Sequence, residues 1–152
     1  MLGDLVFVKP TNAIGKLVAF LGGSSYSHVG ILMEDNQIAE INLGKPFSVY
    51  PMRYTEYDVY RVNQTFDQAV LKSIINSKIG MKYDTLDLLR ILFRLTIRAT
   101  PNKVICSEVV NQCFEQLGIQ LSRHKIPTPQ DLIEGGKLER VEYNGFGGIK
   151  NT

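Results

Sequence analysis

Residues 103–110 read Lys-Val-Ile-Cys-Ser-Glu-Val-Val, and the rest of the chain is organised around this stretch. A short apolar entry leads into Cys106, and apolar residues then recur with helical spacing until Gly118. The pattern predicts a helix that has Cys106 at its N-terminus or one turn inside it. A start at Pro101 is the alternative, and it would move Cys106 into the second turn.

The position of Cys106 at a helix start has a chemical consequence. The first N–H groups of a helix lack partners within the helix, and the helix dipole is positive at that end. Both favour a thiolate over a thiol, and the thiolate is the nucleophilic form. The alternative interpretation is that Cys106 is a small apolar residue of the core.

Composition limits the class of protein. The chain has 152 residues and is 44% hydrophobic, which fits a single domain over 1–152 with a loose tail from about residue 145. The net charge of +2 is too small to indicate a nucleic-acid partner. Leu86–Ile97 is the longest apolar stretch, and it is too short and too charged to span a bilayer.

The two cysteines and the first residues bear on the cellular location. Cys106 and Cys113 fall on one predicted helix, about 10 Å apart by helical rise, which is beyond the reach of a disulfide. Free thiols are typical of a reducing compartment. The first residues show no pattern of a signal peptide, so we expect a cytoplasmic location, with phage-type or non-classical export left open.

Apolar periodicity predicts an α+β fold rather than alternating α/β, because strands crowd the first half and helices the second. Strands are predicted over 5–8, 28–33, 37–42, 47–50, 57–62 and 138–143. Helices are predicted over about 12–21, 65–77 with Thr65 as its cap, 83–99, 106–117 and 127–132.

A cysteine nucleophile needs a base, usually histidine, and the base needs an orienting acceptor. His28 begins a predicted strand, whereas His124 lies in a polar basic loop and is expected to be solvated. The loop before His28 could form the edge of a substrate cleft, which makes Tyr26 and Ser27 candidate substrate-binding residues. The alternative for His28 is a structural histidine at the end of a strand.

Glu40 interrupts an otherwise apolar strand and is the candidate orienter. If residues 34–36 close a hairpin, Gly30 faces Glu40 and His28 faces Asn42, so that His28 and Glu40 are diagonal neighbours on one face. A two-residue loop would place them on opposite faces, which keeps Asn42 as the reserve orienter. The alternative for Glu40 is an exposed charge on an edge strand.

Three further features of the sequence bear on the site. Tyr83 precedes the cysteine helix and is a candidate pocket residue, although a packed tyrosine beside a helix cap is favoured. The backbone N–H of Cys106 is the better candidate oxyanion donor. The sequence shows none of the familiar metal-binding motifs, so neither a metal nor a cofactor is expected.

Arg90, Arg94 and Arg98 form one basic stripe on an apolar segment. The stripe suggests an anionic partner, either a membrane surface or a carboxylate-bearing peptide. A solvated helix face is the favoured alternative.

Six segments occur in an order that resembles a known family: 3–7, 27–31, 38–40, 83–84, 106–110 and 128–132. They resemble the circularly permuted NlpC/P60-like papain-fold hydrolases, and within these the YiiX/YebB/YycO-like branch. In that branch the histidine and the acidic residue precede the cysteine, as they do here. The resemblance implies an antiparallel sheet of five to six strands packed against a helical subdomain that carries the cysteine helix.

Carried over by position, the resemblance implies His28 as the base, Glu40 as the orienter and Cys106 as the nucleophile. The implied activity is a thiol hydrolase that cleaves an amide bond, for example in a peptidoglycan-type peptide, or an ester bond. A lipid acyltransferase or lipase with the same triad is an alternative, and so is an inactive binding module with a buried Cys106. The sequence leaves the substrate and the oligomeric state open.

Overall fold

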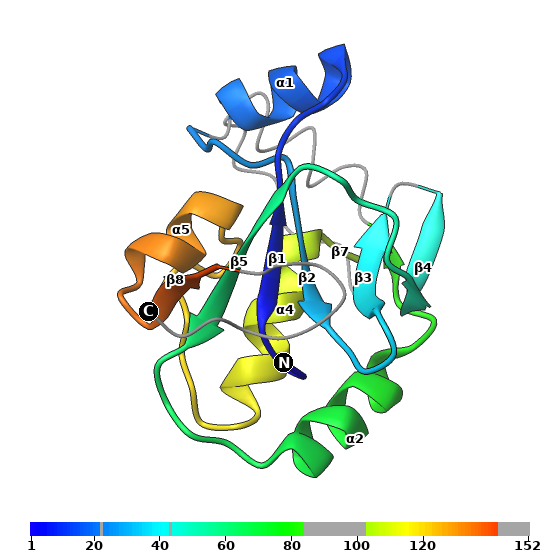
Figure 1. Ribbon diagram of the computed structural model, residues 1–152, viewed down its shortest axis with the longest axis vertical. Coiled ribbons are helices and arrows are strands. Elements are labelled where there is room, and N and C mark those ends of the chain that lie inside the picture. The colour runs from blue at the N-terminus through cyan, green and yellow to red at the C-terminus, as the bar shows by residue number, and fades with distance from the viewer. Residues whose placement is uncertain (22, 43, 84–102, 143–152) are drawn as a thin grey trace.

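The computed structural model describes residues 1–21, 23–42, 44–83 and 103–142, and its centre is a six-stranded antiparallel sheet (Figure 1). The strand order is β4-β3-β2-β1-β5-β8, so that β1 and β2 are the central strands. The strands are β1 (Leu5–Val8), β2 (His28–Leu32), β3 (Gln37–Asn42), β4 (Lys45–Pro51), β5 (Tyr57–Val62) and β8 (Leu138–Val141). The short strands β6 (Lys82–Tyr83) and β7 (Lys103–Val104) pair in parallel as a separate ribbon.

Four described helices surround this sheet: α1 (Ala13–Leu21), α2 (Gln68–Lys78), α4 (Cys106–Glu115) and α5 (Pro129–Glu134). In Figure 1, α4 lies across the back of β1 and β2, and α1 stands at the top of the molecule. The start of α5 is fixed by a capping box, in which the Thr128 side chain accepts from the N–H of Asp131 and the Asp131 side chain accepts from the N–H of Thr128.

The core forms where alternate side chains of the sheet meet α4. Leu5 and Phe7 of β1 face the helix side, and Val6 and Val8 join a smaller cluster on the opposite face. This alternation follows from the two-residue period of a strand. From α4, the main cluster takes the fully buried side chains Val109, Val110, Cys113 and Phe114.

The hairpin of β2 and β3 has the register that places the candidate base and acid together. Ile31 pairs with Ala39 and Leu32 with Ile38, and counting on by one residue in this register sets Gly30 against Glu40. Asp35 and Asn36 in the connecting loop have positive φ angles of 54° and 55°, which these residue types tolerate in tight turns. Gly30 is required here, because a Cβ atom would lie 2.7 Å from the Ile38 side chain.

The predicted α+β class is confirmed, and most predicted elements recur with shifted ends. The cysteine helix begins at Cys106 and follows β7 directly, so the alternative start at Pro101 is wrong. The predicted cap at Thr65 is also wrong, because α2 begins later and Asp67 accepts hydrogen bonds from the N–H groups of Ala69 and Val70.

Some predictions fall outside the described part of the chain. Tyr83 belongs to β6 rather than to a helix start, and the remainder of the predicted 83–99 helix lies beyond the described residues, as does the tail from about 145. Within the ranges that the structure describes, no helix is both long and apolar enough to cross a membrane.

Candidate active site

Cys106 is the first residue of α4, and local backbone geometry places it there. Ile105 occupies the N-cap position with extended backbone angles (φ −96°, ψ 164°), and its side chain offers no capping hydrogen bond. The side chain of Cys106 is 7% exposed, and its sulfur accepts hydrogen bonds from the backbone N–H groups of Val29 and Ser107. The helix start thus contributes the N–H of Ser107, and the central strand β2 contributes the N–H of Val29.

His28 and Glu40 are joined by a short buried hydrogen bond. The distance from His28 Nε2 to Glu40 Oε2 is 2.7 Å, and the side chains are 10% and 0% exposed. The two residues are diagonal neighbours of the β2–β3 hairpin, the arrangement expected from a loop over 34–36. Because Nε2 is engaged by Glu40, Nδ1 is the ring nitrogen left for the thiol of Cys106.

The imidazole of His28 also interacts with Cys106, which completes a chain of sulfur, imidazole and carboxylate. Burial raises the pKa of the Cys106 thiol, but the hydrogen bond and charge of His28 outweigh it and hold that pKa below its ordinary value. Burial lowers the pKa of His28, but its bonds to Cys106 and Glu40 raise it to about 9. Both pKa shifts favour the thiolate–imidazolium pair over the neutral thiol and neutral imidazole.

Glu40 remains charged although it is buried. Burial raises the pKa of this carboxyl, but the hydrogen bonds from His28 and Tyr54 and the charge of Arg53 bring it below its ordinary value. Arg53 Nη1 lies 2.5 Å from Glu40 Oε1, and Tyr54 Oη lies 2.8 Å from Glu40 Oε2. The carboxylate thus has charge-assisted partners on both oxygens, which fix its orientation toward His28.

Arg53 and Tyr54 were not found by sequence reasoning. They lie in the connection between β4 and β5, where no periodic pattern marks a position as buried or facing the site. The side chains also bond to one another, because Arg53 Nη2 donates to Tyr54 Oη over 2.9 Å. The only signal in the sequence was an adjacent arginine and tyrosine after a short strand, which is too common to indicate a role.

The remaining candidate residues have other partners in the structure. The Asn42 side chain donates to Tyr54 Oη over 3.1 Å, so Asn42 supports Tyr54 and does not bond His28. The hydroxyl of Tyr26 donates to Asp58 over 2.7 Å. Ser27 precedes β2, and its backbone N–H bonds the carbonyl of Val8. Tyr83 lies in β6, and its side chain is outside the described part of the structure.

No set of described side chains fits a metal ion. Among residues 1–21, 23–42, 44–83 and 103–142, no group of three or more His, Cys, Asp or Glu side chains is arranged to hold one. In the candidate site itself, His28 Nε2 and both oxygens of Glu40 are already taken by hydrogen bonds.

The chain combines an antiparallel sheet with a buried cysteine at a helix start, and a histidine and an acid precede that cysteine in the sequence. These features define a permuted papain-like cysteine hydrolase. A sequence model of the family described as "Permuted papain-like amidase enzyme, YaeF/YiiX, C92 family" matches residues 1–139, and the chain belongs to this family. The resemblance to the permuted papain-fold hydrolases and the predicted class of enzyme, a cysteine hydrolase, are thereby confirmed.

The comparison with solved structures supports the same fold. The chain is similar to a crystal structure titled metalloprotein yiiX from Escherichia coli O157:H7, with a TM-score of 0.65 and 19% sequence identity. The alignment covers 95% of this chain and 97% of that one. At this identity the likeness shows the fold alone. Among curated proteins, no sequence relative matches the chain.

Proposed function

We propose that the protein hydrolyses an amide bond of a peptide, with Cys106 as nucleophile, His28 as general acid and base, and Glu40 as the orienting acceptor. The observation that carries this proposal is the buried chain of Cys106, His28 and Glu40, in which the thiol pKa is lowered and the imidazole pKa is raised. Family membership supports a cysteine-dependent amidase, and the three residues supply its chemistry.

In the first half-reaction the Cys106 thiolate attacks the carbonyl carbon of the amide and forms a carbon–sulfur bond. The backbone N–H of Cys106 is placed at the helix start to donate a hydrogen bond to the resulting oxyanion. The His28 imidazolium gives its proton to the amide nitrogen, the carbon–nitrogen bond breaks, and the amine leaves. A thioester on Cys106 and a neutral His28 remain.

In the second half-reaction His28 takes a proton from water as the water oxygen attacks the thioester carbon. The carbon–sulfur bond then breaks, which releases the carboxylic acid and restores the thiolate beside the imidazolium. Throughout both steps Glu40 stabilises the positive ring through Nε2, and Arg53 and Tyr54 hold Glu40 in place.

Alkylation by iodoacetamide tests the reactive thiolate directly. We expect Cys106 to be labelled well below pH 8, because its thiolate is stabilised by His28. Cys113 is the internal control, since burial raises the pKa of its thiol to about 12 and it should stay unlabelled. His28→Ala should remove the preference for Cys106. Equal, slow labelling of both cysteines would instead indicate an inactive binding module.

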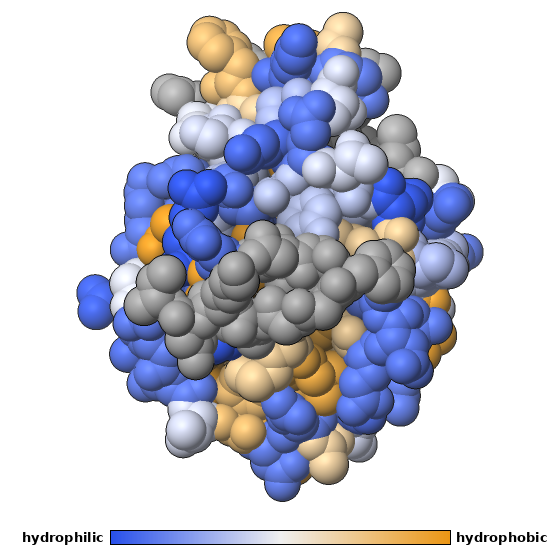
Figure 2. All heavy atoms as spheres, in the orientation of Figure 1, coloured by the Kyte–Doolittle hydropathy of each residue, from blue (hydrophilic) through white to orange (hydrophobic). Residues whose placement is uncertain are grey.

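An ester of a lipid acyl group is the second candidate substrate, and the surface of α1 favours it. Phe20 is 80% exposed and Leu17 is 53% exposed, and Figure 2 shows apolar atoms at the α1 end of the molecule. The stripe of Arg90, Arg94 and Arg98 lies outside the described residues, so contact with a membrane surface remains a prediction. Peptide p-nitroanilides and long-chain p-nitrophenyl esters separate the candidates, because an amidase cleaves the former and a lipase cleaves only the latter.

A further inference from the structure

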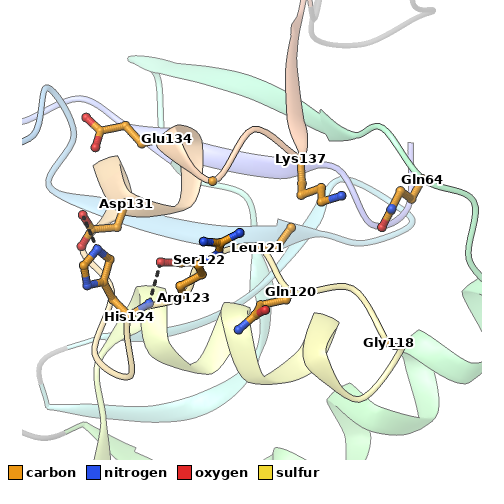
Figure 3. Close-up of a pocket in the computed structure, with 11 residues that line it drawn as sticks. Gln64, Gly118, Gln120, Leu121, Ser122, Arg123, His124, Asp131, Glu134 and Lys137 are labelled. Carbon is orange, nitrogen blue, oxygen red and sulfur yellow. Dashed lines mark hydrogen bonds and ion pairs between the residues drawn. The ribbon is translucent and has the colours of Figure 1, made fainter.

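The structure contains a cavity of about 640 Å³ that takes no part in the proposed mechanism (Figure 3). None of the three proposed catalytic residues lines it. Its walls come from the link after β5, the loop between α4 and α5, the helix α5 itself and the link before β8. The lining residues are Gln64, Gly118, Gln120, Leu121, Ser122, Arg123, His124, Asp131, Glu134, Gly135 and Lys137.

The cavity walls are held by buried contacts. The Asn111 side chain on α4 accepts the backbone N–H of Ser122 over 3.0 Å, which anchors the loop to the helix. Gly135 lies so close to this loop that a Cβ atom would fall 1.7 Å from the carbonyl oxygen of Leu121. The cavity is therefore a formed feature of the fold, because its shape does not depend on exposed side chains alone.

Four long side chains bring unused hydrogen-bonding groups to this space. The side chains of Gln64, Gln120, Arg123 and Lys137 make no hydrogen bond or ion pair with any residue that the structure describes. Two of them are cations and two are amides. In Figure 3 the Arg123 guanidinium lies in the middle of the group, and Lys137 and Gln64 lie together at one end.

The acidic side chains lie at the opposite end of the cavity. Figure 3 shows Asp131 and Glu134 together on the side away from Lys137. Asp131 is committed to the backbone of Thr128 and lies 4.0 Å from His124 Nε2. Glu134 accepts from Gln130 through Oε1, which leaves Oε2 for another donor. The cavity is therefore positive in the middle and at one end, and acidic at the other.

We propose that this cavity binds a short peptide with free ends, as an accessory site for the peptide class named in the proposed function, on which this inference rests. Arg123 and Lys137 would hold the terminal carboxylate, because guanidinium groups match carboxylates in charge and geometry. Gln64 and Gln120 supply amides for the peptide groups, and Glu134 takes the ammonium end. The volume fits a ligand of that size.

Two observations bear on this choice of ligand. Leu121 is the only apolar side chain in the described lining, which disfavours a lipid chain. The acidic end also lies near the catalytic helix, because the hydroxyl of Ser107, next to Cys106, donates to the carbonyl of Pro127 at the entry to α5. A peptide in the cavity would thus be held along the helix that carries the nucleophile.

The test uses the full chain with Cys106→Ser, so that binding is measured without turnover, and NMR titration with triglycine. We expect saturable binding that shifts the amide signals of residues 118–124 and 131–137. Triglycine amide, which lacks the carboxylate, should bind about tenfold more weakly, and Arg123→Gln should cause a similar loss. The matched control is Lys125→Gln, an exposed cation of the same loop that does not line the cavity.

Three outcomes would overturn the inference. One is no shift in these residues with triglycine, and another is equal affinity in the Arg123 and Lys125 variants. The third is that inorganic phosphate binds more tightly than triglycine and that its binding requires Arg123. The cavity would then be an inorganic anion site. Since the variant lacks the Cys106 nucleophile, failure of this test is distinct from failure of the proposed hydrolysis.

Discussion

Replacing Glu40 with glutamine should move the alkaline limit of hydrolysis, because the carboxylate raises the pKa of His28. The neutral amide keeps the shape and can still accept a hydrogen bond, but it removes a buried charge 2.7 Å from the ring nitrogen. A hydrogen bond to a charged group contributes about 1.5–3 kcal/mol. One pKa unit corresponds to about 1.4 kcal/mol, so the pKa of His28 should fall from about 9 to roughly 7–8.

The sign of the effect on hydrolysis follows from the proton that His28 must donate. Above its pKa the imidazole is neutral and cannot protonate the leaving amine, so activity declines on the alkaline side. The native enzyme should lose half of its activity near pH 9, and Glu40→Gln should do so near pH 7–8.

The assay is a pH profile of kcat/KM with an amide substrate, with circular dichroism to show that each variant is folded. Glu34→Gln is the matched control: Glu34 pairs with Lys72 on the surface, 61% exposed, and its loss should leave the profile unchanged. If Glu40→Gln lowers activity at every pH without moving the alkaline midpoint, Glu40 does not tune His28 and the reasoning is refuted.

Three further variants test the surroundings of the site and the fold. Tyr54→Phe removes one donor to Glu40, which should lower kcat/KM about fivefold and shift the alkaline midpoint less than Glu40→Gln does; an unchanged profile would exclude a positioning role. Arg61→Ala removes the bidentate partner of the buried Asp4 carboxylate and leaves it the N-terminal ammonium of Met1 at 3.0 Å, so the free energy of unfolding should fall by about 1.5–3 kcal/mol in urea titrations, and a loss under 1 kcal/mol would contradict this. Gly30→Ala should destabilise the hairpin by about 1–3 kcal/mol because its Cβ meets a side chain of β3, and an unchanged thermal midpoint would show that the hairpin adapts.

The parts of the site that depend on local sequence could be predicted. The hairpin of β2 and β3 has a short loop, so its register follows from counting residues, and that register brings His28 beside Glu40. The helix start at Cys106 is likewise visible in apolar spacing. The approach of Cys106 to His28 joins distant segments, so no local pattern predicts it; the need of a cysteine nucleophile for a base and the resemblance to a family pointed to it.

The parts that depend on the path of irregular segments could not be predicted. Arg53 and Tyr54 reach Glu40 from the β4–β5 connection, where no period of two or 3.6 residues fixes the direction of a side chain. The observed cap of α2, Asp67, differs from the predicted cap, Thr65, for a similar reason. Both residue types are good caps, so local sequence does not decide between them. The 640 Å³ cavity needs four separate segments at once, and no local pattern encodes that.

The sulfur of Cys106 receives its contacts with His28 and Val29 from β2, a part of the chain nearly eighty positions earlier, while base and acid are neighbours in one hairpin. Until the two segments meet, the cysteine of a newly made or partly unfolded chain has the ordinary, sluggish chemistry of a free thiol. Nucleophilicity then arises only with the finished tertiary structure. Alkylation of Cys106 at neutral pH would therefore report native protein, molecule by molecule, in a mixture with misfolded chains.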